Sequence, residues 1–289
     1  MMNKSKGNGK GKNKRELSNI LREGFETWSR NLNIAVPFIL SSVLTAIMIV
    51  IVVGAGILVT GGPSLIYLYH FGEEVPAELI PQLKSQFMHS LHVIISLLGI
   101  IIALGLLINA YFTAGAIGMV KEATKRGRTS ISDMLRYGSR NFIQLLFAEI
   151  IVALIATLAF GIAFLIPVPE MSSRVALLLM LIALSYIMIV SIIFALVPYA
   201  VVIGGRNAIA GVGESLKLFK AHKLDVFLLW LIVIGIGAFT GFLLGFMPHI
   251  IGQVISIILS VVIIQPLAVT WWSKLYMQYA GDGVVTMAL

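Results

Sequence analysis

Six long apolar segments dominate this chain and restrict the folds that are open to it. They cover residues 34–60, 91–120, 142–166, 175–203, 226–247 and 250–276. Each is longer than the ~20 apolar residues that cross a bilayer core of about 30 Å. A soluble domain has no core in which six runs of this length can be buried. The segments therefore predict an all-α integral membrane protein with six transmembrane helices.

The basic residues lie almost entirely on one side of these segments. Of 21 Lys and Arg residues, only Lys84 and Arg174 fall on the other side. Loops rich in Lys and Arg stay in the cytoplasm, so we expect a multi-pass protein of the cell membrane with both termini in the cytoplasm. The net charge of +8 lies beside the bilayer, which makes anionic lipid head groups, and not nucleic acid, the expected partner.

Composition divides the chain into three regions. Residues 1–15 are mostly Lys, Asn, Gly and Ser, which predicts a disordered basic cytoplasmic tail. Residues 16–280 hold the six-helix domain, and residues 281–289 form a short cytoplasmic tail. The only sizeable exterior connection is residues 61–90. No connection has room for a soluble catalytic domain, and no cofactor is expected. The lack of cysteine excludes disulfides and thiolate metal sites.

An amphipathic stretch precedes each outward span, over residues 16–30, 131–140 and 209–221. The predicted turns into the spans are at residues 30–31, 140–141 and 221–222. These features predict three parallel hairpin repeats, each preceded by a cytoplasmic amphipathic interfacial helix. The alternative is that any six-span protein with basic loops shows some likeness between its parts. Pro37, Pro198 and Pro266 fall at similar depths, and each can kink its helix.

Glu149 is the sharpest candidate for chemistry within the membrane. It lies eight residues past Asn141, about 12 Å along a helix. A carboxylate at that depth is costly unless it is protonated or hydrated. Its expected companions in a possible intramembrane polar site are Asn109, Gln144 and Gln265. Such a site either relays protons or cations, or ties the helices together by hydrogen bonds.

Small residues recur at four-residue spacing on three predicted spans, the third span carrying Ala153, Thr157 and Gly161. The helix-packing candidates are Gly237, Gly241 and Gly245 on the fifth span, and Ala110, Ala114 and Gly118 on the second. Such stripes let helix backbones approach closely. They hold the bundle together or face a second subunit, which leaves a homo-oligomer or another membrane protein as possible partners.

The histidines and the aromatic residues give fewer indications of a functional site than Glu149 and the small-residue stripes. His89 and His92 lie three apart on the exterior side, and with His70 they form a weak possibility for a metal site, but their spacing matches no zinc signature. An interfacial aromatic belt accounts for the aromatic residues near the basic connections. These are Trp28, Trp271, Trp272, Tyr276 and Tyr279.

Three stretches resemble a known group of proteins. They are ILREGFETWSRN (20–31), AGAIGMVKEA (114–123) and GESLKLFKAHKLDVF (213–227). They are similar to uncharacterised, mainly archaeal, six-span membrane proteins, which are distantly similar to the membrane domain of glycerophosphoryl diester phosphodiesterases. The resemblance implies a helical membrane domain over most of residues 16–280. It carries over no catalytic residue, because that phosphodiesterase chemistry resides in a separate soluble barrel.

These features together favour a non-enzymatic polytopic membrane protein. We expect a scaffold or accessory subunit that acts through helix packing and a basic cytoplasmic face. The alternative is a small transporter or channel for a lipid-like or small polar molecule, proton-coupled through Glu149. No phosphate-binding Gly-Lys-Ser/Thr loop, Gly-x-Ser-x-Gly turn or His-Glu-x-x-His helix is present, so an enzyme is not expected.

Overall fold

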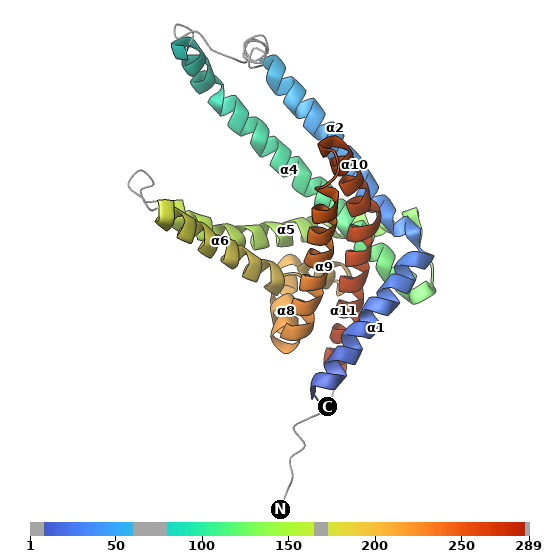
Figure 1. Cartoon of the computed structure of the whole chain (residues 1–289). Coiled ribbons are helices and arrows are strands. Elements are labelled where there is room, and N and C mark those ends of the chain that lie inside the picture. The colour runs from blue at the N-terminus through green and yellow to red at the C-terminus, as the bar shows by residue number, and fades with distance from the viewer. Residues whose placement is uncertain (1–8, 60–79, 165–172, 287–289) are drawn as a thin grey trace, which may run out of the picture. The chain divides into compact units, whose positions relative to one another are not determined.

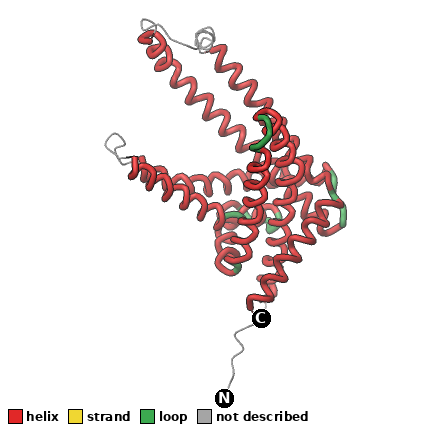
Figure 2. Tube along the Cα trace, viewed as in Figure 1, coloured by secondary structure: helices red, strands yellow, loops and turns green. Residues whose placement is uncertain are grey.

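The computed structural model describes residues 9–59, 80–164 and 173–286, and every regular element in these ranges is helical (Figure 1, Figure 2). Within them, 6 helices are long and apolar enough to cross a membrane, which confirms the predicted number of spans. In chain order the elements are α1 (Gly9–Arg30), the 3₁₀ turn η1 (Leu32–Ala35), α2 (Val36–Val59), α4 (Ile80–Arg126), α5 (Ile131–Phe164), α6 (Ser173–Ile193), α7 (Val197–Val202), α8 (Ala208–Ala221), α9 (Lys223–Leu244), α10 (His249–Leu259), the π-helical turn η3 (Ser260–Ile264) and α11 (Gln265–Thr286).

Several predicted boundaries differ from the structure. Helix α4 begins at Ile80, so the last part of the predicted exterior connection is helical, while residues 60–79 lie outside the described residues. Helix α5 runs unbroken from Ile131 to Phe164, and the predicted turn at residues 140–141 is wrong. No proline interrupts this stretch, so nothing forces the backbone to turn there. Helix α1 already begins at Gly9, inside the predicted tail, and α11 continues to Thr286.

Pro37 and Pro198 each stand second in a helix that follows a turn, whereas Pro266 lies in a continuous helical run just after the π-helical turn η3. Pro37 follows η1, Pro198 follows the turn that ends α6, and Pro266 follows η3. Proline lacks the N–H that would continue a preceding helix, but it is tolerated in a first helical turn. The break before Pro198 leaves the Ile193 carbonyl to accept a 2.9 Å hydrogen bond from the buried Ser215 hydroxyl of α8.

The chain divides into two compact units. Unit 2 is Leu40–Asn109 and contains most of α2 and the first part of α4. Its two helices approach closely at Gly56, where a Cβ would lie 2.5 Å from Cδ1 of Leu97. A larger residue at Gly56 would therefore require the Leu97 side chain to move.

Unit 1 comprises Met1–Ile39 and Ala110–Leu289. Its buried apolar residues gather at one end, where α1 lies beside α11 and the ends of α4, α5, α7, α8 and α9 meet (Figure 1). The Trp271 indole of α11 donates a 2.9 Å hydrogen bond to the Leu21 carbonyl of α1, and Gly24 makes room for the same ring. By contrast, in the most apolar 18-residue stretch of each unit 1 span, only 11–17% of the residues are buried. The spans therefore present apolar surface outward along most of their length.

Candidate functional site at the basic end

The packed end of unit 1 also carries most of the described Lys and Arg residues. We call it the basic end, and it comprises α1, residues 121–140, residues 203–223 and the part of α11 from residue 270 to 280. Three groups of polar side chains tie its helices together. Each group pairs a carboxylate with a tyrosine hydroxyl, and each carboxylate lies on a different helix.

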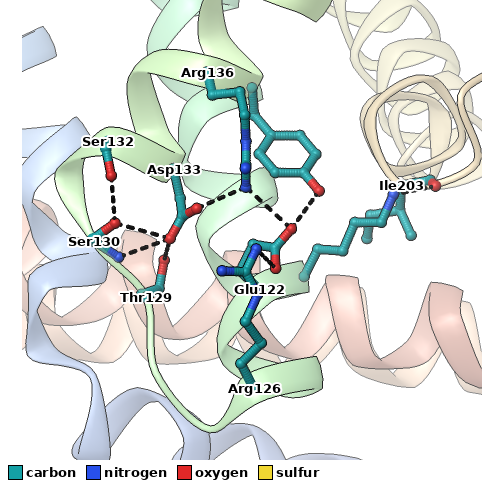
Figure 3. Close-up of polar contacts among 10 residues, drawn as sticks. Glu122, Arg126, Thr129, Ser130, Ser132, Asp133, Arg136 and Ile203 are labelled. Carbon is teal, nitrogen blue, oxygen red and sulfur yellow. Dashed lines mark hydrogen bonds and ion pairs between the residues drawn. The ribbon is translucent and has the colours of Figure 1, made fainter.

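The first group, the Glu122 cluster, joins α4 to α5 (Figure 3). Glu122 is buried and accepts a 2.7 Å hydrogen bond from the Tyr137 hydroxyl. Arg126 lies 2.5 Å from one Glu122 oxygen, and Arg136 lies 3.3 Å from the other. Arg136 also lies 2.7 Å from the buried Asp133. Both acids are thus neutralised within the chain, while the two arginine side chains remain 54% exposed.

The connection between α4 and α5 is fixed by hydrogen bonds within α5 and by hydrogen bonds with the turn after α1. Gly127 ends α4 with a positive φ of 75°, a conformation that favours glycine. Asp133 accepts hydrogen bonds from the Ser130 amide at 3.1 Å and the Ser130 hydroxyl at 3.0 Å, so its carboxylate satisfies a backbone donor at the start of α5. Asn31 donates to the Gly127 carbonyl and accepts from the Thr129 amide, so the turn after α1 is joined to the same connection.

The second group joins α8 to α11. The Tyr276 hydroxyl donates a 2.5 Å hydrogen bond to Glu214, and Arg206 lies 2.6 Å from the other oxygen of the same carboxylate. The hydrogen bond to Glu214 raises the pKa of Arg206 above its already high ordinary value. Arg206 therefore stays charged at any physiological pH. Gly204 lies so close to the Tyr276 hydroxyl that a Cβ there would collide with it.

The third group joins α9 to α11. The Tyr279 hydroxyl donates a 2.8 Å hydrogen bond to Asp225, and both residues are buried. The His222 ring stacks on the Tyr279 ring at 3.7 Å between centroids, with 5° between the planes. The buried carboxylate of Asp225 thus has a hydrogen-bond donor on its own chain, as burial of a polar group demands.

These groups turn the acids of the basic end inward and leave its bases outside. Glu122, Asp133 and Asp225 are buried and Glu214 is half-buried, and each has a partner within the chain. The exposed acids described at this end are Glu23 and Glu26 of α1. The exposed bases are Arg22, Arg30, Lys125, Arg126, Arg128, Arg136, Arg140, Arg206, Lys217, Lys220 and Lys223. The exposed ionisable side chains of the basic end are therefore mostly cationic, although Arg126, Arg136 and Arg206 also pair with the inward-turned acids.

The aromatic belt expected near this end is wrong for most of its members. Trp271, Trp272, Tyr276 and Tyr279 are 2–7% exposed, so they lie in the core of the chain and not against lipid. The reason is that α1, α8 and α9 cover α11 and supply partners for the aromatic N–H and O–H groups. Trp28 is half-buried and packs at the edge of the same core.

The four residues of the predicted intramembrane polar site have different surroundings. Gln144 accepts a 3.2 Å hydrogen bond from the Ala208 amide at the start of α8. Gln265 donates a 3.1 Å hydrogen bond to Ser260 within its own helix. Asn109 is the last residue of unit 2. Glu149 is half-buried on α5 and lines a crevice of about 260 Å³ between α5 and the α6–α7 segment. A shared role for the four stays a prediction.

The small-residue stripes of the second and fifth predicted spans differ in their packing. Ala110 and Ala114 are fully buried, and a Cβ on Gly118 would lie 2.1 Å from Cγ of Tyr137, so this stripe packs within the chain. At Gly237 and Gly241, a Cβ would meet no atom within 4 Å among the residues that the structure describes. Gly245 has only carbonyls of its own helix turn nearby. This second stripe therefore does not hold the described bundle together, and its contact with a neighbouring chain stays a prediction.

The histidines form no metal site that the structure describes. His70 lies outside the described residues, and of His89 only the helical backbone is described. His92 is exposed on α4. Within the described ranges, no group of three His, Asp, Glu or Cys side chains comes together to hold a metal ion.

Sequence reasoning did not find the three carboxylate–tyrosine pairs. Their partners lie 15, 62 and 54 residues apart along the chain. Only the position of each acid beside a predicted apolar stripe could have indicated that it turns inward. The spacing gave no indication of which tyrosine it meets.

Comparison with known proteins places the chain among uncharacterised archaeal sequences. A curated protein of Archaeoglobus fulgidus, described as an uncharacterized protein, is 25% identical over 284 residues, which covers 90% of this chain and 94% of the relative. No solved structure matches the chain. The distant similarity to the phosphodiesterase membrane domain stays a prediction. The family described as "Domain of unknown function (DUF7847)" matches residues 18–278, and the chain therefore belongs to that family.

Proposed function

We propose that this protein is a non-enzymatic scaffold or accessory subunit of the cell membrane that binds the anionic inner leaflet through its basic end. The supporting observation is the separation of charge at that end, where the acids are enclosed by tyrosines and arginines while the bases remain exposed. Anionic lipid head groups attract such residues with about 1 kcal/mol each near the surface. The orientation follows from the same charge, with both termini in the cytoplasm.

The repeated hairpins belong to this proposal. Pro198 and Pro266 stand at corresponding places in the second and third returning spans, Pro198 after the turn that ends α6 and Pro266 after the π-helical turn η3. Helix α4 continues through the matching position, Thr113, without a break. We infer three parallel hairpins whose interfacial segments, α1, the start of α5, and α8, line the inner leaflet. The packed basic end then serves as a platform from which apolar helix faces extend into the bilayer.

The test compares stability in bilayers of different charge. The full-length protein is placed in nanodiscs of zwitterionic lipid, with or without an anionic lipid, and thermal unfolding is followed. We expect anionic lipid to raise the unfolding temperature of the wild type. Exchange of Lys217, Lys220 and Lys223, all exposed on and just after α8, for glutamine should remove a large part of that gain.

Arginine variants provide the matched control. Arg128 and Arg174 are both exposed, but Arg174 lies at the other end of α6. Arg128→Gln should reduce the gain from anionic lipid, and Arg174→Gln should leave it unchanged. High salt should reduce the gain for the wild type, because the attraction is screened. An equal gain for the wild type and the triple variant would contradict the proposal.

The crevice beside Glu149 favours a second candidate function, a small transporter coupled to protons through that residue. A carboxylate that lines a cavity at membrane depth is a usual mark of a proton or substrate pathway. In reconstituted vesicles, Glu149→Gln should then abolish proton-coupled flux of the transported molecule. Unchanged flux in that variant would remove the relay.

A further inference from the structure

The crevice between α5 and the α6–α7 segment is built from one face of each helix. Helix α5 contributes Glu149, Ala153 and Ala156, at i, i+4 and i+7. The facing segment contributes Val190, Phe194 and Val197, again at helical spacing. The crevice is open on one side, has a volume of about 260 Å³, and lies entirely within unit 1.

Small residues and a helix break produce the hollow. Ala153 and Ala156 leave space on α5 that larger side chains would fill. Helix α6 ends at Ile193, and the following turn places Phe194 at the wall of the crevice, before α7 begins with Val197 and Pro198. The shape therefore depends on the proline-associated break as well as on the alanines.

The lining has the chemistry of a site for an organic cation. Glu149 is the acidic residue of a wall that is apolar apart from Ser191, and Phe194 adds an aromatic ring to the same wall. A carboxylate and an aromatic face together attract a cation, and the aromatic contribution grows when the cation is desolvated. The apolar remainder matches hydrocarbon substituents and offers too few oxygen ligands to coordinate a metal ion directly.

We propose that this crevice binds a lipophilic organic cation, such as a quaternary ammonium or phosphonium ion, with its charge at Glu149 and one apolar substituent against Phe194. The proposal goes beyond both functions given above and requires neither of them. Binding to the crevice places no demand on the basic end, and it can occur without movement of the ion across the membrane.

Two ions of the same size and shape but opposite charge provide a direct test. Tetraphenylphosphonium is a cation, and tetraphenylborate is its anionic counterpart. Binding of each to the full chain in nanodiscs is measured by equilibrium dialysis, with empty nanodiscs subtracted. We expect saturable binding of tetraphenylphosphonium and only lipid partitioning of tetraphenylborate. Equal saturable binding of both ions would overturn the proposal, because charge would then play no part.

Substitutions in the crevice separate the contributions of Glu149 and Phe194 to phosphonium binding. Glu149→Gln should weaken phosphonium binding by roughly tenfold or more, because the neutral amide cannot balance a desolvated cation. Phe194→Leu should weaken it by a few fold through loss of the aromatic face. Glu23→Gln, which removes an exposed acid of α1, is the matched control and should bind like the wild type. Wild-type affinity in Glu149→Gln would refute the site.

A substitution that fills the crevice tests the proposal even if Glu149→Gln does not fold. Ala153→Leu keeps the carboxylate and occupies the hollow, so it should abolish saturable phosphonium binding. Retained binding in Ala153→Leu would show that the ion binds elsewhere. The unfolding temperature of each variant in zwitterionic nanodiscs, compared with the wild type, shows that loss of binding is not loss of fold.

Discussion

The hydroxyl of Tyr137 on α5 donates a 2.7 Å hydrogen bond to the buried carboxylate of Glu122 on α4. The same carboxylate meets Arg126 and Arg136, so four side chains from two helices share one buried charge. Similar pairs, Tyr276 with Glu214 and Tyr279 with Asp225, join α8 and α9 to α11. The basic end is thus held by acids that have partners within the chain, while lysines and arginines remain exposed on its surface.

Removal of the Tyr137 hydroxyl should destabilise the packed end. We expect Tyr137→Phe to lower the free energy of unfolding by about 1.5–3 kcal/mol, the usual range for a hydrogen bond to a charged group. The control is Tyr186→Phe, because Tyr186 donates at 2.9 Å to the neutral Ile155 carbonyl. That change should cost only about 0.5–1.5 kcal/mol. Denaturant titration in detergent micelles measures both values, and equal losses would show that the charge of Glu122 adds nothing.

Two glycines should respond oppositely to the same substitution. In Gly118→Ala, the new Cβ would lie 2.1 Å from Cγ of Tyr137, so the ring must move and we expect a loss of about 1–3 kcal/mol. In Gly241→Ala, the new Cβ meets open space among the described residues, and the helix gains up to about 1 kcal/mol from lower backbone entropy in the unfolded chain. The unfolding free energies of the two variants in micelles check this. A large loss in Gly241→Ala would indicate that a neighbouring chain covers this face.

Ser215 should stabilise the break between α6 and α7. Its hydroxyl donates at 2.9 Å to the Ile193 carbonyl, which the turn at Phe194 leaves without a helical partner. We expect Ser215→Ala to cost about 1–3 kcal/mol, because the carbonyl loses its partner inside the packed end. Ser185→Ala is the control, since Ser185 is exposed and bonds only to Leu181 of its own helix. That variant should unfold like the wild type, and a similar loss in both would contradict the role of Ser215.

The spans were predictable from the sequence, whereas the contacts that hold them were not. Apolar length alone located six helices, because a membrane-spanning run must satisfy its backbone within itself. The Ser130–Asp133 cap was also predictable, since its geometry is local. The burial of Trp271 and Tyr276 was not, because aromatic residues near basic loops also occur at membrane interfaces, and only the packing of α1 and α8 on α11 separates the two cases.

The turn expected at residues 140–141 illustrates a second limit. A change from amphipathic to uniformly apolar sequence marks where a helix enters the membrane, but not whether its axis bends there. Between α8 and α9 the chain does break, at His222, whereas α5 continues through the corresponding point. The π-helical turn at Ser260–Ile264 likewise has no local sequence signal apart from Pro266, which follows it.

The central claim is that six apolar helices cross the membrane with the basic end facing the cytoplasm. The chain has no cysteine, so single cysteines can be introduced one at a time without background. Ser132 is exposed at the basic end, and Phe246 is exposed in the turn between α9 and α10. On intact cells, a membrane-impermeant maleimide should label Phe246→Cys and should label Ser132→Cys only after the cells are opened. Labelling of Ser132→Cys from outside would contradict the orientation, and with it the proposed contact between the basic end and the inner leaflet.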